Sequence, residues 1–292
     1  MQEIKKRLTS GQSDLAAHSY KSYYQMTGAE RQAFISEQCE AFNSRVGNLN
    51  EQDGYDCPIC RNKGQKSSVV KTGRMINGEP EYIETVSDCI CKSVRASLRR
   101  MQKSGLSNVL EKYTFANFNA VEPWQKALKD SAQRFVANGG GVFFVGGQSG
   151  GGKTHICTAI TGALMRRGKA AYYMLWQDEV IKLKSCVTDD EYQKQIARLK
   201  NVDVLYIDDF LKPVGENPKP SAADIRIAYE LINYRYSNGG GVTIISSERY
   251  VHEILEIDEA TGGRLIEYAG EYITNIKRDR ARNYRLRNLG MV

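Results

Sequence analysis

The sequence predicts an α/β fold with a five-stranded parallel sheet between helices, preceded by a small helical and cysteine-rich N-terminal region. Three observations support this. Helical and strand-like segments alternate from about Val121 to the end of the chain. A short apolar run, Val142–Val145, leads into a glycine-rich loop, and four cysteines form two close pairs ahead of the alternating part. Such alternation is typical of a parallel sheet covered by helices, with ligands at the carboxyl ends of the strands.

Length and charge bound the class of protein. A chain of 292 residues has room for about two domains. The net charge of +7 is a modest basic excess. Six basic residues lie between Lys277 and Arg287, where a polyanion partner and an ordinary solvated surface are both compatible with the charge. No apolar run reaches the ~20 residues that span a bilayer, and the N-terminus lacks a secretory apolar region, so we expect a soluble cytoplasmic protein without a membrane partner.

Residues 1–54 are predicted to be a helical N-terminal region. Thr27 and Glu30 have the spacing of a capping box, and apolar residues then recur at helical intervals. These residues are Phe34, Ile35, Cys39, Phe42 and Val46. We expect this stripe to pack against a neighbouring helix of the same chain, with docking onto a partner as the alternative.

Residues 55–110 are predicted to be a zinc-binding module followed by a basic helix. Its metal ligands would be Cys57, Cys60, Cys89 and Cys91. Two nearby thiolates can turn a knuckle around one ion, and β-prone segments at 67–71 and 82–86 predict a hairpin that returns the second pair to the first. Four sulfur ligands favour a closed structural Zn²⁺ site, with four reduced structural cysteines as the alternative. The basic helix, residues 92–110, either follows a nucleic-acid backbone or presents a solvated face.

Residues 111–120 are predicted to be an extended aromatic linker, whose Tyr113, Phe115 and Phe118 either cover a nucleotide base or pack in the core. Residues 121–292 are predicted to be the alternating domain. Its helices are expected at 124–137, 153–167, 177–185, 189–200, 222–236, 251–257 and 259–269. Its strands are expected at 142–145, 170–175, 202–207, 242–245 and 272–276.

The glycine-rich loop carries a specific functional signal. Gly147, Gly152, Lys153 and Thr154 match the phosphate-loop pattern at every fixed position. Glycines let backbone N–H groups converge on phosphate oxygens, and the N-terminus of the next helix adds a favourable dipole. Lys153 would reach the β- and γ-phosphates, and the Thr154 hydroxyl would bind Mg²⁺. The predicted nucleotide-binding residues of the loop are Gly147, Ser149, Gly150, Gly151, Gly152, Lys153, Thr154 and His155.

Two further strand ends carry polar residues. One apolar strand ends in two carboxylates, of which Asp208 would hold Mg²⁺ and Asp209 would orient and polarise the attacking water. Another strand runs into Ser246, Ser247 and Glu248, which would also reach the γ-phosphate region. We therefore expect a nucleoside triphosphate at this edge of the sheet.

Together with Gly262-Gly263-Arg264 and the segment 283–287, these motifs resemble the AAA+ ATPase domain of DnaC/DnaI-type replicative helicase loaders, especially versions carried by phages of low-GC Gram-positive bacteria. The cysteine module and linker resemble the amino-terminal half of DnaI-type loaders. The likeness therefore covers nearly the whole chain and is weakest over residues 1–50. A phosphate loop alone is shared by many NTPases, whereas its combination with Arg264 and the Asn-Tyr-Arg ending is much more specific.

The resemblance implies roles for several residues. Arg264 looks like the arginine finger that reaches a neighbouring protomer's γ-phosphate, and Arg285 looks like sensor 2, which acts on nucleotide within its own subunit. Ser247 and Glu248 occupy the sensor-1 position. The chain also resembles this family in lacking a full helical lid. The basic residues that match the family's single-stranded DNA contact are Lys182, Lys184, Lys194 and Arg198.

On this resemblance the protein would load a DnaB-type ring helicase onto single-stranded DNA during replication initiation. It would act in the bacterial cytoplasm, or in the host's if phage-encoded, as an ATP-dependent homo-oligomer with ATP, Mg²⁺ and Zn²⁺. Its catalytic residues would be Lys153, Asp208, Asp209, Arg264 and Arg285. The alternatives are an IstB-like transposition helper ATPase and an ATP-binding adaptor without significant hydrolysis. Asp209 replaces the usual glutamate and Glu248 the usual asparagine, which predicts slow intrinsic hydrolysis.

Overall fold

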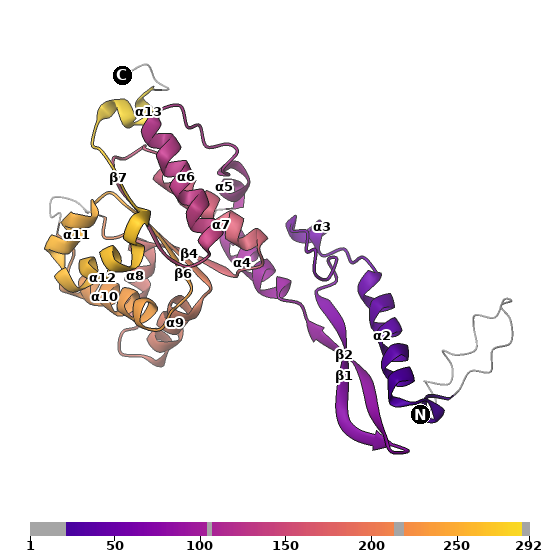
Figure 1. The fold of residues 1–292 in the computed structure, drawn as a ribbon. Coiled ribbons are helices and arrows are strands. Elements are labelled where there is room, and N and C mark those ends of the chain that lie inside the picture. Colours follow the sequence, from indigo (N-terminus) through magenta and orange to yellow (C-terminus); the bar gives the residue numbers. More distant parts are fainter. Residues whose placement is uncertain (1–21, 104–106, 213–218, 288–292) are drawn as a thin grey trace. The chain divides into compact units, whose positions relative to one another are not determined.

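The computed structural model describes residues 22–103, 107–212 and 219–287. The chain divides into two compact units: residues up to Asn50 with Asp56–Cys89, and Glu51–Tyr55 with Ile90 onward (Figure 1). Helix predicted before residue 22 lies outside the described residues. Within the described ranges, no helix is long and apolar enough to cross a membrane.

The first unit is a helix on a hairpin. Its elements are η1 (Tyr23–Gln25), α2 (Gly28–Ser44), β1 (Gln65–Ile76) and β2 (Glu79–Asp88). They are coloured indigo to purple in Figure 1. The strands pair antiparallel with Ser67 opposite Val86, which confirms the predicted hairpin. The two-residue turn has positive φ at Asn77 (54°) and Gly78 (81°), as hairpin turns of this length require. At the start of α2, the Thr27 hydroxyl accepts from the Glu30 amide at 3.2 Å, so the predicted cap is confirmed.

The face that α2 buries differs from the predicted stripe. The helix packs on β1 and β2 rather than on a neighbouring helix, so that prediction was wrong. Ile35 and Cys39 are buried as expected, but Phe34 and Val46 are 37% and 73% exposed. The buried line runs through Arg31, Ile35 and Cys39 at four-residue spacing, because Arg31 is the residue that binds the hairpin.

Arg31 ties the helix to the hairpin turn. Its side chain is fully buried, with 0% exposure. One terminal nitrogen donates to the carbonyl oxygens of Ile76, Glu79 and Pro80 at 3.2–3.3 Å. The rest of the guanidinium donates to the carbonyls of Tyr23 (3.0 Å) and Tyr24 (3.2 Å). Since a buried cation is tolerated only when its donors are satisfied, these carbonyls explain how a charged residue lies in this interface.

The second unit is built on a five-stranded parallel sheet in the order β4-β5-β6-β3-β7. The strands are β3 (Gly141–Gly147), β4 (Ala171–Leu175), β5 (Val204–Asp208), β6 (Val242–Ser247) and β7 (Ile273–Ile276). Three of them, β5, β6 and β3, are adjacent in the middle, and they are the strands that precede the predicted phosphate loop and acidic motifs. Parallel pairing therefore brings those motifs to one edge of the sheet.

Helices cover both faces of this sheet. One face carries α4 (Cys91–Lys103), α6 (Pro123–Asn138) and α7 (Lys153–Arg166). The other carries α8 (Trp176–Ser185), α9 (Asp190–Asn201), α10 (Ala222–Ser237), α11 (Val251–Ile257) and α12 (Glu259–Ala269). The remaining elements are α3 (Asn50–Asp53), α5 (Ser107–Lys112), η2 (Gly270–Tyr272), η3 (Arg280–Arg282) and α13 (Tyr284–Arg287). The sandwich predicted from the sequence is confirmed, with each strand and helix of residues 121–276 within two residues of its predicted bounds.

A second buried arginine joins one end of this sheet to the helices beside it. Arg235 on α10 is 1% exposed, and burial lowers its pKa to about 10. Its Nε donates to the Thr243 hydroxyl at 2.7 Å and one terminal nitrogen donates to the Val242 carbonyl at 2.9 Å. The other terminal nitrogen donates to the carbonyls of Leu199, Lys200 and Val202 at 2.9–3.0 Å. One side chain thus links α9 and the segment entering β5 to the start of β6.

We predict that Arg235→Met lowers the free energy of unfolding of the second unit by at least about 3 kcal/mol, because several buried carbonyls lose their donor. Both tryptophans of the chain, Trp124 and Trp176, lie in this unit, so urea unfolding followed by tryptophan fluorescence reports on it alone. Arg226→Ala, at an exposed position of the same helix, is the control and should stay within about 0.5 kcal/mol. Equal unfolding free energies for the two variants would contradict the role of Arg235.

Candidate functional site

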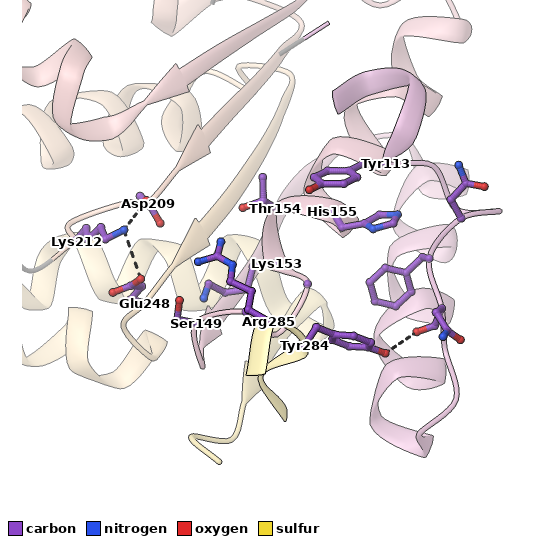
Figure 2. Close-up of a pocket in the computed structure, with 15 residues that line it drawn as sticks. Tyr113, Ser149, Lys153, Thr154, His155, Asp209, Lys212, Glu248, Tyr284 and Arg285 are labelled. Atoms are coloured by element: carbon purple, nitrogen blue, oxygen red, sulfur yellow. Dashed lines mark hydrogen bonds and ion pairs between the residues drawn. The ribbon is translucent and has the colours of Figure 1, made fainter. Parts of the chain in front are cut away.

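A cavity of about 530 Å³ lies at the edge of the sheet where β3, β5 and β6 end. Figure 2 shows Asp209, Lys212 and Glu248 toward one end of it and Tyr113 with His155 toward the other. The size falls in the range of small-molecule sites. The described residues that line it are Tyr113, Asn117, Phe118, Asn119, Ser149, Gly150, Gly152, Lys153, Thr154, His155, Asp209, Lys212, Glu248, Tyr284 and Arg285.

The glycine-rich loop forms the floor of the cavity. Gly147 ends β3, and an added Cβ there would lie 2.2 Å from the Ile276 carbonyl oxygen of the neighbouring strand. Gly152 precedes α7 with φ of 86°, a conformation that favours glycine. Lys153 is 7% exposed and its Nζ donates to the carbonyls of Gly147 (2.8 Å) and Gln148 (3.0 Å). Burial lowers the pKa of Lys153, and the ammonium lies within the loop where phosphates bind in P-loop proteins.

Asp208 is the buried acid at the end of β5, with 6% exposure. Its carboxylate accepts from the hydroxyls of Tyr173 at 3.1 Å, Thr154 at 3.5 Å and Ser246. Burial beside this carboxylate raises the pKa of Tyr173, so its phenol stays a proton donor. Thr154 and Asp208, the two predicted magnesium ligands, are therefore neighbours at the start of α7.

The side chains at the end of β6 alternate. The Ser246 hydroxyl also accepts from the Asp209 amide at 3.3 Å, so Ser246 faces the acidic motif. Ser247 is 0% exposed and its hydroxyl donates to the Phe210 carbonyl at 2.7 Å. The structure thus places Ser247, predicted to contact nucleotide, away from the cavity and puts Ser246 beside Asp208 instead. Successive residues of a strand point to opposite faces, which is the physical reason.

Lys212 joins two acidic side chains at the end of the cavity opposite Tyr113 and His155. Its Nζ lies 2.9 Å from the Asp209 carboxylate and 3.4 Å from the Glu248 carboxylate (Figure 2). Hydrogen bonding to Asp209 raises the pKa of Lys212 above its ordinary value. A carboxylate about 4 Å from a phosphate charge would cost about 4 kcal/mol at an effective dielectric constant near 20, so a cation here matters for binding an anion. Sequence reasoning missed Lys212, since nothing in the pattern separates it from other surface lysines.

The linker before α6 forms the opposite end of the cavity. The Tyr113 ring stacks on His155 at 4.6 Å and 11°, and the Phe118 ring meets His155 edge-on at 5.1 Å. Burial lowers the pKa of His155, so the imidazole is neutral at pH 7 and fixed by its contact with the Thr114 carbonyl at 3.0 Å. The linker forms a turn at 115–117 rather than the predicted extended segment, because its aromatic rings fold onto α7.

The C-terminal segment closes a third side. The Tyr284 amide donates to the Gly150 carbonyl at 3.1 Å, and the Tyr284 hydroxyl donates to the Asn119 carbonyl at 3.1 Å. An added Cβ on Gly150, whose φ is 72°, would lie 2.0 Å from the Asn283 side-chain oxygen. This segment therefore holds Arg285 at the cavity, and Figure 2 shows its side chain on the side of Lys153 and Ser149.

Arg264 is held outside the cavity. It lies on α12, where its Nε donates to the Asn233 side chain at 2.6 Å and its guanidinium lies 5.0 Å from the Tyr229 ring centroid. A terminal nitrogen donates to the Ala260 carbonyl at 2.9 Å. Arg264 is thus absent from the set of described residues that line the cavity, unlike Arg285.

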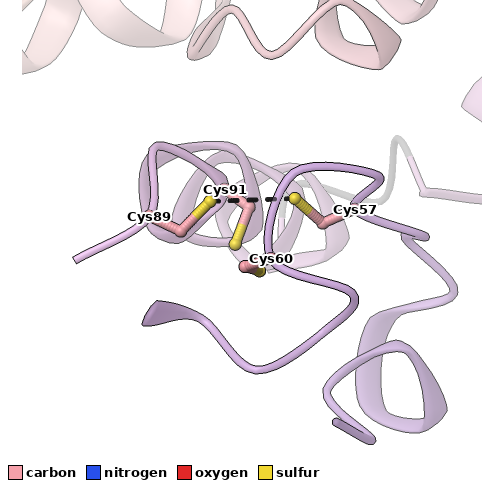
Figure 3. Close-up of side chains that lie close together, drawn as sticks. All are labelled: Cys57, Cys60, Cys89 and Cys91. Atoms are coloured by element: carbon pink, nitrogen blue, oxygen red, sulfur yellow. Dashed lines mark hydrogen bonds between the residues drawn. The ribbon is translucent and has the colours of Figure 1, made fainter. Parts of the chain in front are cut away.

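The four paired cysteines form a second cluster (Figure 3). The sulfurs of Cys57, Cys60, Cys89 and Cys91 all lie within 4.8 Å of one another, and all four residues are buried. Tetrahedral zinc with Zn–S bonds of about 2.3 Å has S–S edges of about 3.8 Å. The Cys57 and Cys89 sulfurs are 3.8 Å apart, so the set fits that ion. The knuckle after Cys60 turns through positive φ at Gly64 (78°).

The phosphate loop, the buried acid and the strand ends define a P-loop nucleotide-binding protein. The chain belongs to the family of IstB-like ATP binding proteins, whose model matches residues 89–256. The resemblance predicted from the sequence is thereby confirmed at the level of an IstB-like ATP-binding domain.

Individual relatives cover more of the chain than this segment. The uncharacterized protein YqaM of Bacillus subtilis (strain 168) is 27% identical over 277 residues, covering 81% of this chain and 87% of YqaM. The phage-like element PBSX protein XkdC of the same strain is 28% identical over 236 residues, covering 76% and 83%. Among solved structures, the DnaC helicase loader is 19% identical with a TM-score of 0.48, covering 58% of this chain and 98% of that one.

We predict that Lys153→Met weakens ATP binding roughly 10- to 150-fold, because one charged hydrogen-bond donor to phosphate is worth about 1.5–3 kcal/mol. Isothermal titration of the full chain with Mg²⁺ and a non-hydrolysable ATP analogue measures this. Lys126→Met, at an exposed position of α6, is the matched control and should bind as the wild type does. Unchanged affinity in Lys153→Met would contradict the assignment of the loop.

Proposed function

We propose that the protein loads a DnaB-type ring helicase onto single-stranded DNA, with ATP holding adjacent copies together. The observation that carries this proposal is the position of Arg264. The cavity has cations from its own chain, Lys153, Lys212 and Arg285, yet the predicted arginine finger lies outside it on α12. A second copy would have to supply that guanidinium. The family match supports the ATPase, and the likeness to a phage-like element protein supports a phage version.

The nucleotide would lie along the cavity. Lys153 would bind the β- and γ-phosphates, and Arg285 would contact phosphate from the same subunit. Thr154 and Asp208, 3.5 Å apart, offer the oxygen ligands that Mg²⁺ prefers. Bound Mg²⁺ would neutralise phosphate charge. At the far end, Tyr113 offers an aromatic surface for the base.

Hydrolysis is proposed to be slow. Asp209 would orient the attacking water, but it has a shorter side chain than glutamate and its carboxylate is bound to Lys212 at 2.9 Å. Each 1.4 kcal/mol added to the activation barrier lowers the rate about tenfold. A carboxylate that is displaced from the water, or held by Lys212, should therefore slow hydrolysis strongly. ATP would then act mainly as an assembly switch, and hydrolysis would release the loader.

Single-stranded DNA is proposed to contact α8 and α9. Lys182, Lys194 and Arg198 are exposed there and can reach a phosphate backbone. Lys184 is less available, because its ammonium lies 2.5 Å from the Asp224 carboxylate. Binding through such residues depends on counterion release and should weaken as salt rises.

A second candidate, an IstB-like transposition helper, is favoured by the description of the matching family. Residues 1–88, including Cys57 and Cys60, lie outside that match. The two Bacillus relatives align over 81% and 76% of the chain, which is a larger share than residues 89–256 make up. Their similarity therefore extends beyond the matched segment, which supports a role for the amino-terminal part. A gene for a replicative helicase beside this one would favour the loader, and a transposase gene would favour the helper.

Zinc is proposed at the four cysteines as a structural ion. We predict one zinc per chain by plasma mass spectrometry of the purified protein, and its loss in Cys57→Ser and Cys91→Ser, since a closed site needs all four thiolates. Cys39→Ser is the matched control, because Cys39 is also buried but lies outside the cluster. A metal-free wild type that keeps its near-ultraviolet spectrum after chelation would contradict the site.

For the loader itself, we predict that the full chain captures the host ring helicase with ATP at least about tenfold more than with ADP, in line with typical coupling energies. Lys153→Met should show no nucleotide dependence and serves as the control. Capture can be measured by affinity pull-down at fixed salt with and without single-stranded DNA. Absence of the helicase under every condition would remove the loader and leave the transposition helper as the better candidate.

A further inference from the structure

Lys212 lies at the end of the cavity where the γ-phosphate of the proposed nucleotide would lie. It lines the phosphate end of the cavity with Asp209 and Glu248, beyond Lys153 and Thr154 on the loop. Its side chain is 33% exposed, so its ammonium is accessible to a ligand in the cavity. An ammonium has three donors, and the two carboxylates engage two of them. The third can bind a phosphate oxygen.

The backbone fixes Lys212 in this place. Asp209 and Leu211 both adopt positive φ, at 55° and 49°, which is uncommon for residues other than glycine. The turn is anchored on both sides, because the Phe210 amide donates to the Ser246 carbonyl at 2.9 Å and the Arg249 Nε donates to the Leu211 carbonyl at 2.7 Å. Strained conformations persist where surrounding contacts impose them, and they cluster at ligand sites.

Charge explains why a cation is needed here. Asp208, Asp209 and Glu248 place three carboxylates around the phosphate end, and the site has to admit a highly charged anion. Lys153 is already bound to the loop carbonyls of Gly147 and Gln148. Lys212 is the described cation in contact with both Asp209 and Glu248. Without it, the Glu248 carboxylate would lose its ion pair, and its negative charge would repel the terminal phosphate more strongly.

We propose that Lys212 is a γ-phosphate ligand that gives the site its preference for ATP over ADP, and that Glu248 is its positioning residue. On triphosphate binding, the third donor of the ammonium binds a γ-phosphate oxygen, and the ammonium then gives up its contact with Asp209 and keeps Glu248. Asp209 is then released to orient water. Binding of the triphosphate and the ability to hydrolyse it are therefore coupled through the Lys212 side chain. The inference rests on the proposed nucleotide chemistry of this cavity.

The test compares two nucleotides on the full chain. Isothermal titration with Mg²⁺ measures the affinity for β,γ-imido-ATP and for ADP in Lys212→Met. The expected result is a loss of roughly tenfold or more for the triphosphate analogue and less than about threefold for ADP, since only the former carries the γ-phosphate. Lys212→Arg keeps the charge and should preserve the preference, and Lys126→Met should bind as the wild type does.

A double variant separates the role of Glu248. In Lys212→Met the Glu248 carboxylate has lost its ion pair, so adding Glu248→Gln should recover at least about threefold in analogue affinity. The proposal is overturned if Lys212→Met weakens both nucleotides equally, changes neither, or is not improved by Glu248→Gln. Tryptophan fluorescence melts verify that each variant is folded. A wild type that binds neither nucleotide would instead refute the nucleotide site itself.

Discussion

The candidate site of this chain depends on parallel pairing of three adjacent strands. Because β5, β6 and β3 run in the same direction, Asp208, Ser246 and the phosphate loop emerge at one edge of the sheet. The contacts there are mutual, since Asp208 accepts from Thr154 of the loop and from Ser246 of the neighbouring strand. The linker and the C-terminal segment then complete the cavity around this fixed centre. The whole site therefore depends on strand order and register.

Much of this arrangement follows from local sequence. Alternation of apolar segments with helical periodicity gave the strands and helices of the second unit, and cysteine spacing gave the cluster. The phosphate loop identified the ligand class because its glycines and Lys153 have separate physical reasons to be there. The tertiary contacts between side chains could not be predicted from the sequence. Ser246 and Ser247 are identical residues, and only the strand's facing decides which one meets Asp208.

Buried charge is the other feature that sequence reasoning could not find. In a basic chain, Arg31 and Arg235 would be expected at the surface, yet both are buried. Each is surrounded by backbone carbonyl oxygens whose positions no sequence pattern predicts. The predicted apolar stripe of α2 was wrong for the same reason, because the buried face of this helix is the one that contains Arg31. Lys212 depends on a turn with two non-glycine residues at positive φ, a conformation that composition does not predict. Each case requires contacts between residues distant in the chain.

The central claim is that a bound triphosphate is shared between the P-loop cavity of one copy and Arg264 of the next, so that occupancy controls association. Sedimentation velocity of the full chain with single-stranded DNA measures this directly. The account predicts larger species with a non-hydrolysable ATP analogue than with ADP, and monomers for Arg264→Ala even when that variant binds the analogue normally. A wild type that sediments identically with both nucleotides, or an Arg264→Ala variant that assembles as the wild type does, would contradict it.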